Sequence, residues 1–138
     1  MRIVVVLVGL VLLFGVLYAN VIRKDPEAVQ PQRPGPIEIK WSTDDETGVL
    51  RFYVLRSCAS KGVLTDFIVV SPPILPQGNG SDYVYRDDPL AKTADYFFIY
   101  KVRIHFRDGS ILETKSTGTP FVSSAAKRTW GSIKAMFR

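Results

Sequence analysis

His105 is the only histidine in the chain, so it is the natural starting point in a search for a catalytic base. Such a base needs a nucleophile beside it and a carboxylate that orients it. Ser110 and Asp108 are close in sequence, but Asp108-Gly109 is a typical hairpin turn, which accounts for both residues. The pattern therefore predicts a histidine on the surface, and we expect the chain not to be an enzyme.

Two short acidic groups, Asp44-Asp45-Glu46 and Asp87-Asp88, could hold calcium if they met at one end of a fold. Neither has regular ligand spacing, so we interpret both as solvated turns.

Cys58 is the only cysteine, which excludes an intramolecular disulfide and a thiolate metal cluster. It is expected to be a packed small residue, with an intermolecular bridge or a modification as the alternative. The sequence has no phosphate loop, nucleophile elbow or zinc spacing. We therefore predict no cofactor, metal or small-molecule substrate.

The net charge of +5 belongs to the C-terminal part of the chain. After Glu113 there is no acidic residue, whereas five basic residues follow it: Lys115, Lys127, Arg128, Lys134 and Arg138. The other 13 basic residues balance the 13 acidic ones. A nucleic-acid-binding domain should carry its basic patch on the folded part, so this distribution argues against that class of protein.

The N-terminal residues form an uncharged apolar run, Ile3–Ile22, whose 20 residues are enough to cross a bilayer as a helix. We assign residues 1–24 to a transmembrane helix and its flanks, with Ile3, Leu10, Phe14 and Ile22 along the span. A signal peptide cleaved after Ala19 is the alternative, but Leu17 lies where the peptidase prefers a small residue. The sequence predicts a single-pass protein, with the bacterial cytoplasmic membrane as its expected location.

The orientation of that span is open. Arg23 and Lys24 after the span favour a cytoplasmic domain, whereas the very short N-terminus resembles an export signal. We expect an extracytoplasmic domain.

Residues 25–36 contain four prolines, which favours extended chain over helix. This segment is either a spacer or an edge strand lying against the domain.

From Ile37 onward the apolar residues alternate with polar ones, which predicts β-strands. We expect strands over residues 37–42, 49–57, 67–70, 83–85, 96–107 and 111–117. About six short strands with turns between them indicate an all-β, antiparallel sandwich. The predicted core consists of Trp41, Phe52, Val54, Tyr96, Phe98, Tyr100, Val102, Ile104 and Phe106. Phe97 and Ile99 fall on the opposite face among cations, so we interpret them as a contact surface.

The order of these features resembles an immunoglobulin-like fibronectin type III domain of the bacterial type, over residues 37–117. Trp41 closes an early strand, residues 52–57 look like the third-strand pattern of that family, and Leu90 to Tyr96 is spaced like its tyrosine corner. The stretch from Tyr100 to Ser110 completes the likeness. The resemblance implies a sandwich over residues 37–118, with Tyr96 hydrogen-bonded to upstream backbone. Members of this family bind partners or act as spacers, without catalytic activity of their own.

Residues 119–138 are expected to form a basic amphipathic helix that docks on lipid headgroups or on a partner protein. Its apolar stripe would comprise Val122, Ala126, Trp130, Ile133, Met136 and Phe137, and its basic flank Lys127, Arg128, Lys134 and Arg138. A helix packed on its own sandwich is the alternative. The residues expected to contact lipid or partner are therefore Phe97, Ile99, Trp130, Ile133, Phe137, Lys127, Arg128, Lys134 and Arg138.

Together these features predict a single-pass, membrane-anchored interaction subunit without catalytic activity. Its expected partners are the lipid bilayer and a larger integral membrane complex of respiratory, photosynthetic, secretion or envelope type. The alternative is a free-standing surface or periplasmic module that binds a soluble ligand such as a glycan.

Overall fold

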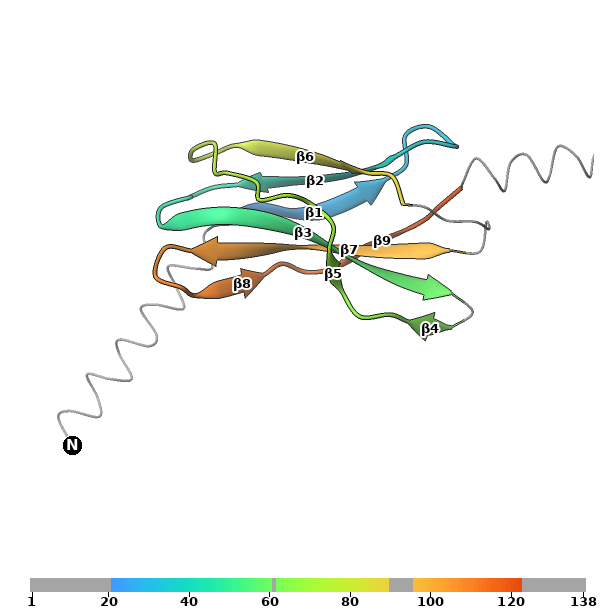
Figure 1. Cartoon of the computed structure of the whole chain (residues 1–138). Helices are drawn as coiled ribbons and strands as arrows, with labels where there is room; N and C mark the ends of the chain where they lie inside the picture. The colour runs from blue at the N-terminus through green and yellow to red at the C-terminus, as the bar shows by residue number, and fades with distance from the viewer. Residues whose placement is uncertain (1–20, 61, 90–95, 123–138) are drawn as a thin grey trace, which may run out of the picture.

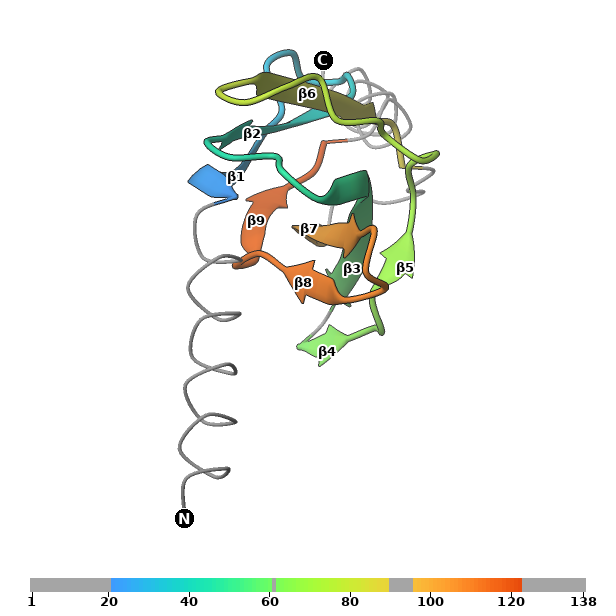
Figure 2. The same ribbon diagram turned by 90° about the vertical axis from the view of Figure 1, so that its left-hand side faces the viewer.

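The computed structural model describes residues 21–60, 62–89 and 96–122, which form two antiparallel sheets stacked face to face (Figures 1 and 2). The three-stranded sheet has the order β1-β2-β6, made of β1 (Ile22–Val29), β2 (Ile37–Thr43) and β6 (Asp82–Asp87). The six-stranded sheet has the order β4-β3-β7-β8, made of β4 (Val63–Leu64), β3 (Val49–Ser60), β7 (Phe97–Phe106) and β8 (Ile111–Glu113). In this second sheet, β5 (Ile68–Val69) also pairs with β3, and β9 (Thr117–Pro120) with β7. The all-β, antiparallel, sandwich-like prediction is confirmed.

The longest pairing joins β3 to β7, from Val49 opposite Phe106 to Ala59 opposite Phe97. Burial alternates strictly along β7, because successive side chains of a strand point to opposite faces. The apolar set from Phe98 to Phe106 therefore faces the other sheet. This facing agrees with the alternation in the sequence.

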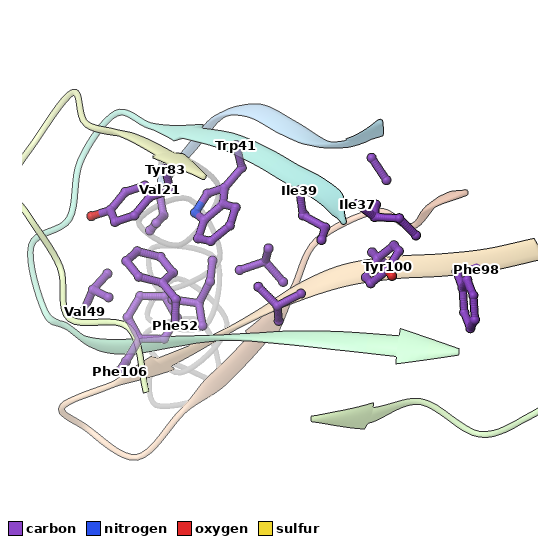
Figure 3. Close-up of a cluster of buried hydrophobic side chains, with 14 of the residues drawn as sticks. Val21, Ile37, Ile39, Trp41, Val49, Phe52, Tyr83, Phe98, Tyr100 and Phe106 are labelled. Atoms are coloured by element: carbon purple, nitrogen blue, oxygen red, sulfur yellow. The ribbon is translucent and has the colours of Figure 1, made fainter. Parts of the chain in front are cut away.

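The core between the sheets is built around an aromatic cluster (Figure 3). The Trp41 ring stacks on Tyr83 at 5.1 Å, and Phe52 is tilted against Tyr83 at the same centroid distance. Eight of the nine predicted core residues are buried; the ninth, Tyr96, is half-buried and stacks on Phe98 at 5.9 Å. Tyr83, Ile37 and Ile39 are further buried residues that the sequence prediction did not include.

The sheet begins earlier than the sequence predicts, because β1 lies in the segment expected to be a span end and a linker. Val21 is 2% exposed and packs in the core, and Ile22 pairs with Thr43. Ile22 therefore belongs to the sandwich, which corrects its assignment to the membrane span. Of the two interpretations of residues 25–36, spacer or edge strand, residues 25–29 form an edge strand. Pro26 fits there because it falls within a register shift between Lys24 and Glu27, where a missing N–H breaks no regular ladder.

The other end of the sandwich also differs from the expected boundaries. The strand expected over residues 111–117 is split into β8 and β9 by residues 114–116, where the Thr114 hydroxyl accepts the Val102 N–H at 3.0 Å. Thr119 and Pro120 are the last two residues of β9, so the region assigned to a C-terminal helix starts inside the sheet. Most of that region, residues 123–138, lies outside the described residues, as do residues 1–20 and the corner segment 90–95. Among described residues, no helix is long and apolar enough to cross a membrane.

Candidate interaction surface

The outer face of the six-stranded sheet carries the two contact residues that the sequence predicts within the described part. Phe97 is 41% exposed and Ile99 is half-buried, and both project from β7 away from the core. The Phe97 ring lies over Gly118 of β9, where an added Cβ would be 2.3 Å from the ring atom Cε1. The absence of a side chain at Gly118 thus lets the Phe97 ring lie close against the strand, while part of the ring stays exposed to solvent.

A second apolar group lies on the same face, around the middle of β3. Leu55 is 1% exposed although it projects away from the main core cluster, and it pairs with Lys101 on one side and Val69 on the other. The Lys101 ammonium lies 4.0 Å from the centroid of the Phe67 ring, a cation–π contact. This face therefore combines aromatic and aliphatic groups with a cation placed directly above a ring.

Two cations of this face, Lys101 and Arg103, share a single carboxylate. Lys101 Nζ is 2.6 Å from one oxygen of Glu113, and Arg103 Nη2 is 3.5 Å from the other. The hydrogen bond from Lys101 is the main reason that the pKa of Glu113 is lowered, with the charges of Lys101 and Arg103 adding to it. Two positive charges against one negative leave this part of the surface positive.

His105 lies on the same face, in an aromatic and cationic setting. Its ring packs edge-on against Tyr53 at 5.0 Å, and the Tyr53 hydroxyl accepts a hydrogen bond from Arg51 at 3.4 Å. Burial, together with the charges of Arg103 and Arg51, lowers the pKa of His105, which favours the neutral ring. The sequence predicts a histidine on the surface, and the structure places His105 on the outer face but half-buried.

The possible nucleophile near His105 has a structural role. The Ser110 hydroxyl donates to Asp108 Oδ1 at 2.5 Å, and the Ser110 carbonyl accepts the Phe106 N–H at 3.0 Å. Both bonds close the hairpin between β7 and β8. His105 and these turn residues thus belong to different local arrangements, one on the sheet face and one in the turn.

The β4–β5 edge of this sheet exposes aliphatic side chains that the sequence prediction missed. Val63 and Leu64 are 67% and 65% exposed, and Ile68 and Val69 follow at 55% and 48%. Sheet edges in soluble proteins are usually protected by charges or short strands. The apolar run from Phe67 to Val70 predicts a strand, but such a run looks the same for a buried strand as for an exposed one.

The acidic groups considered for calcium lie at opposite ends of β2 and serve as internal ties. Glu46 is 6% exposed and accepts hydrogen bonds from the Tyr83 hydroxyl, from the Thr43 hydroxyl at 2.6 Å and from the Gly78 N–H at 2.8 Å. Asp87, at the other end, accepts from Tyr100. Within the described residues, no group of three His, Cys, Asp or Glu could hold a metal ion.

Asp87 joins the two sheets through a largely buried ion pair. Its Oδ2 is 2.7 Å from Arg56 Nη1 and 2.7 Å from the Tyr100 hydroxyl. Burial is the main reason that the pKa of Tyr100 is raised, and the hydrogen bond to the Asp87 carboxylate adds to it. Arg56 also lies over the Phe98 ring, 5.4 Å from its centroid. These contacts tie β6 of one sheet to β3 and β7 of the other.

The other predicted contact residues lie outside the described residues, so the structure does not bring them to this surface. They are the span residues Ile3, Leu10 and Phe14 and the tail residues Trp130, Ile133, Phe137, Lys127, Arg128, Lys134 and Arg138. Cys58 is half-buried, and burial raises the pKa of its thiol.

Comparison with known proteins assigns no family to the chain. No family model matches it, and no curated protein does. Among solved structures, it is similar to the crystal structure of pectate lyase Pel3 from Pectobacterium carotovorum, with 19% identity and a TM-score of 0.44. The likeness covers 70% of this chain and 26% of that one. We correct the prediction that the chain is not an enzyme, because this similar structure is an enzyme by its title. A likeness this weak assigns neither an activity nor a fold.

Proposed function

We propose that this chain is a single-pass, membrane-anchored interaction subunit. Its fibronectin type III-like sandwich would dock on a larger membrane protein complex, outside the bacterial cytoplasmic membrane. The observation that carries the proposal is the concentration of exposed apolar and aromatic groups on the six-stranded sheet and its β4–β5 edge. Contiguous exposed apolar surface in a folded domain marks an interaction site.

The anchor is supported by the sequence that precedes β1. Ile3–Asn20 contains 18 residues without a charge, and a helix of that length would be about 27 Å long. Eighteen residues fall within the range of roughly 17–25 residues with which a helix spans a bilayer. The charged residues Arg23 and Lys24 follow directly, as they do at the ends of many spans.

The finer fold assignment is supported by the connections between the sheets. The chain passes from β2 to β3 and from β6 to β7 by crossing from one sheet to the other, as in immunoglobulin-like sandwiches. Trp41 at the end of an early strand packs in the core against Phe52, with ring centroids 6.2 Å apart. Both residues belong to the pattern on which the fibronectin type III resemblance rests.

The test is purification of the tagged full chain from its own membranes in mild detergent. We expect stoichiometric membrane partners to accompany the chain. Ile68→Asp should remove them, whereas the matched control Val84→Asp, on β6 of the other sheet and equally exposed at 55%, should keep them. A chain that purifies alone would contradict the proposal and favour the free-standing module. Loss of partners in both variants would contradict the choice of surface.

A further inference from the structure

Val21, the first described residue, already lies in the core of the sandwich. Val21 is 2% exposed, its carbonyl accepts the Asp44 N–H at 2.8 Å, and β1 starts at the next residue. A residue fixed in the core in this way ties the chain to one end of β1. If the preceding segment is embedded in a bilayer, the sandwich is held close to the lipid surface at the same end.

The same end of the sandwich carries three polar loops. The Thr43 N–H donates to Ser81 at 2.9 Å, and the Arg107 N–H donates to Gly48 at 2.8 Å, so turns from both sheets gather around the entry point. The chain leaves the described region at the opposite end, where the Gln30 side chain pairs with both backbone groups of Val122 at 2.9 and 3.0 Å. Nine residues of extended chain separate Val21 from Gln30, about 30 Å.

The entry point belongs to the three-stranded layer, and this decides which face can meet lipid. Packed sheets lie about 10 Å apart. If the six-stranded face lay on the bilayer, Val21 would be at least that far above the lipid surface. In the proposed anchor, the 18 uncharged residues from Ile3 to Asn20 are close to the shortest length that spans a bilayer, which leaves little chain to cover that gap.

We propose that the outer face of the six-stranded sheet is held away from lipid and receives the extramembrane domain of a neighbouring membrane protein that presents acidic and apolar groups. This inference rests on the proposed anchor. The acidic character of the partner follows from charge complementarity, because this face and its β4–β5 edge carry three cations, Arg51, Lys101 and Arg103, against two carboxylates, Glu113 and Asp66. The exposed aliphatic residues at the β4–β5 edge supply the apolar part of the contact.

The orientation is tested with the full chain in vesicles whose lipids carry a headgroup quencher. In a Cys58→Ser background, single cysteines labelled with a fluorophore replace Thr47 in the entry-end loop or Val69 on the six-stranded face. We expect strong quenching at position 47 and at least fivefold weaker quenching at position 69. Equal quenching at both positions would overturn the inference, since this face would then lie on lipid. Failure of the chain to float with the vesicles would instead overturn the proposed anchor.

The partner chemistry is tested by charge reversal in the purified complex. Arg51→Glu should lower the amount of co-purified membrane protein at least tenfold, whereas Arg86→Glu, on the other sheet, should leave it unchanged. Arg51→Gln should give an intermediate loss. Unfolding midpoints equal to wild type show that the variants are folded. If a folded Arg51→Glu retains the partner, the acidic-partner assignment is wrong.

Discussion

The two outer faces of this sandwich differ in what they show to solvent, although they cover the same core. The exposed side of the three-stranded sheet carries four cations and four anions, Arg23, Lys24, Lys40, Arg86, Asp25, Glu27, Glu38 and Asp82. Two ion pairs cross this face, Arg23–Asp82 at 3.1 Å and Arg86–Glu38 at 4.0 Å. The six-stranded sheet instead exposes rings, aliphatic groups and an excess of positive charge.

This difference shows that burial in the core determines the fold, while the opposite side of each strand is free to carry function. A balanced, ion-paired face is what a surface in contact with water needs. A face with Phe97, Leu64 and Val69 exposed would be costly in water unless something covers it.

The largest effect is expected from the core that both faces share. Phe52→Ala removes a fully buried ring from the aromatic cluster, which should lower the free energy of unfolding by about 3–5 kcal/mol. Denaturant unfolding of the full chain in detergent measures this loss. Since one core supports both sheets, the two faces should lose structure together. Separate transitions for the two sheets would show that the sandwich is not a single cooperative unit.

A comparable loss is expected where the sheets are tied by charge. Arg56→Ala leaves the buried Asp87 carboxylate without its ion-pair partner and should cost about 3–5 kcal/mol. The matched control, Arg86→Ala, breaks an exposed pair and should cost at most about 1 kcal/mol. Both are measured by the same unfolding experiment. Equal losses would mean that the tie between the sheets is no stronger than a surface pair.

Stability at high pH should depend on Tyr83. Burial and the hydrogen bond to Glu46 raise its pKa to about 12, above the ordinary value of 10.0. A phenol whose folded-state pKa is raised stabilises the fold fully below pH 10, and this contribution is lost as the pH rises through about 12. Thermal melts of wild type should therefore fall steeply over that interval. The melting temperature of the Tyr83→Phe variant should fall less steeply with pH. An unchanged slope would show that the ionisation of Tyr83 does not limit stability at high pH.

The smallest effect on stability is expected at Gly118. In Gly118→Ala the new methyl group overlaps the Phe97 ring, which is exposed and can swing outward, so we expect a loss of about 1 kcal/mol or less. Partner retention should nevertheless fall, because the Phe97 ring would be displaced from its place against the strand. Unfolding and co-purification of the same sample measure the two quantities. A variant that is stable and retains its partner would exclude Phe97 from the contact.

The strands whose burial alternates along their length could be predicted from the sequence. In β7 the residues from Phe98 to Phe106 face the core as expected, because one buried face imposes a period of two on the residue types. The first strand could not be predicted in the same way. Four prolines between residues 25 and 36 hide it, and Pro26 is tolerated only because the register shifts there.

Local sequence patterns also could not predict the exposed β4–β5 edge or the burial of Glu46. Val63 and Ile68 belong to two-residue strands whose exposure depends on where the sheet ends. Glu46 looks like a solvated turn residue, but its partner Tyr83 is 37 residues away in sequence. Both properties arise from contacts between distant segments. Sequence alone therefore identified two residues of the candidate surface on β7 and missed its edge.

The central claim is that the six-stranded face, and not the three-stranded face, meets the partner. A photo-crosslinking amino acid placed at Val69 or at Val84, with the full chain in its native membranes, tests this directly, because the two positions are similarly exposed at 48% and 55%. The account predicts a protein adduct of discrete mass from position 69 and none from position 84. An adduct from position 84 alone, or adducts only with lipid from position 69, would contradict it.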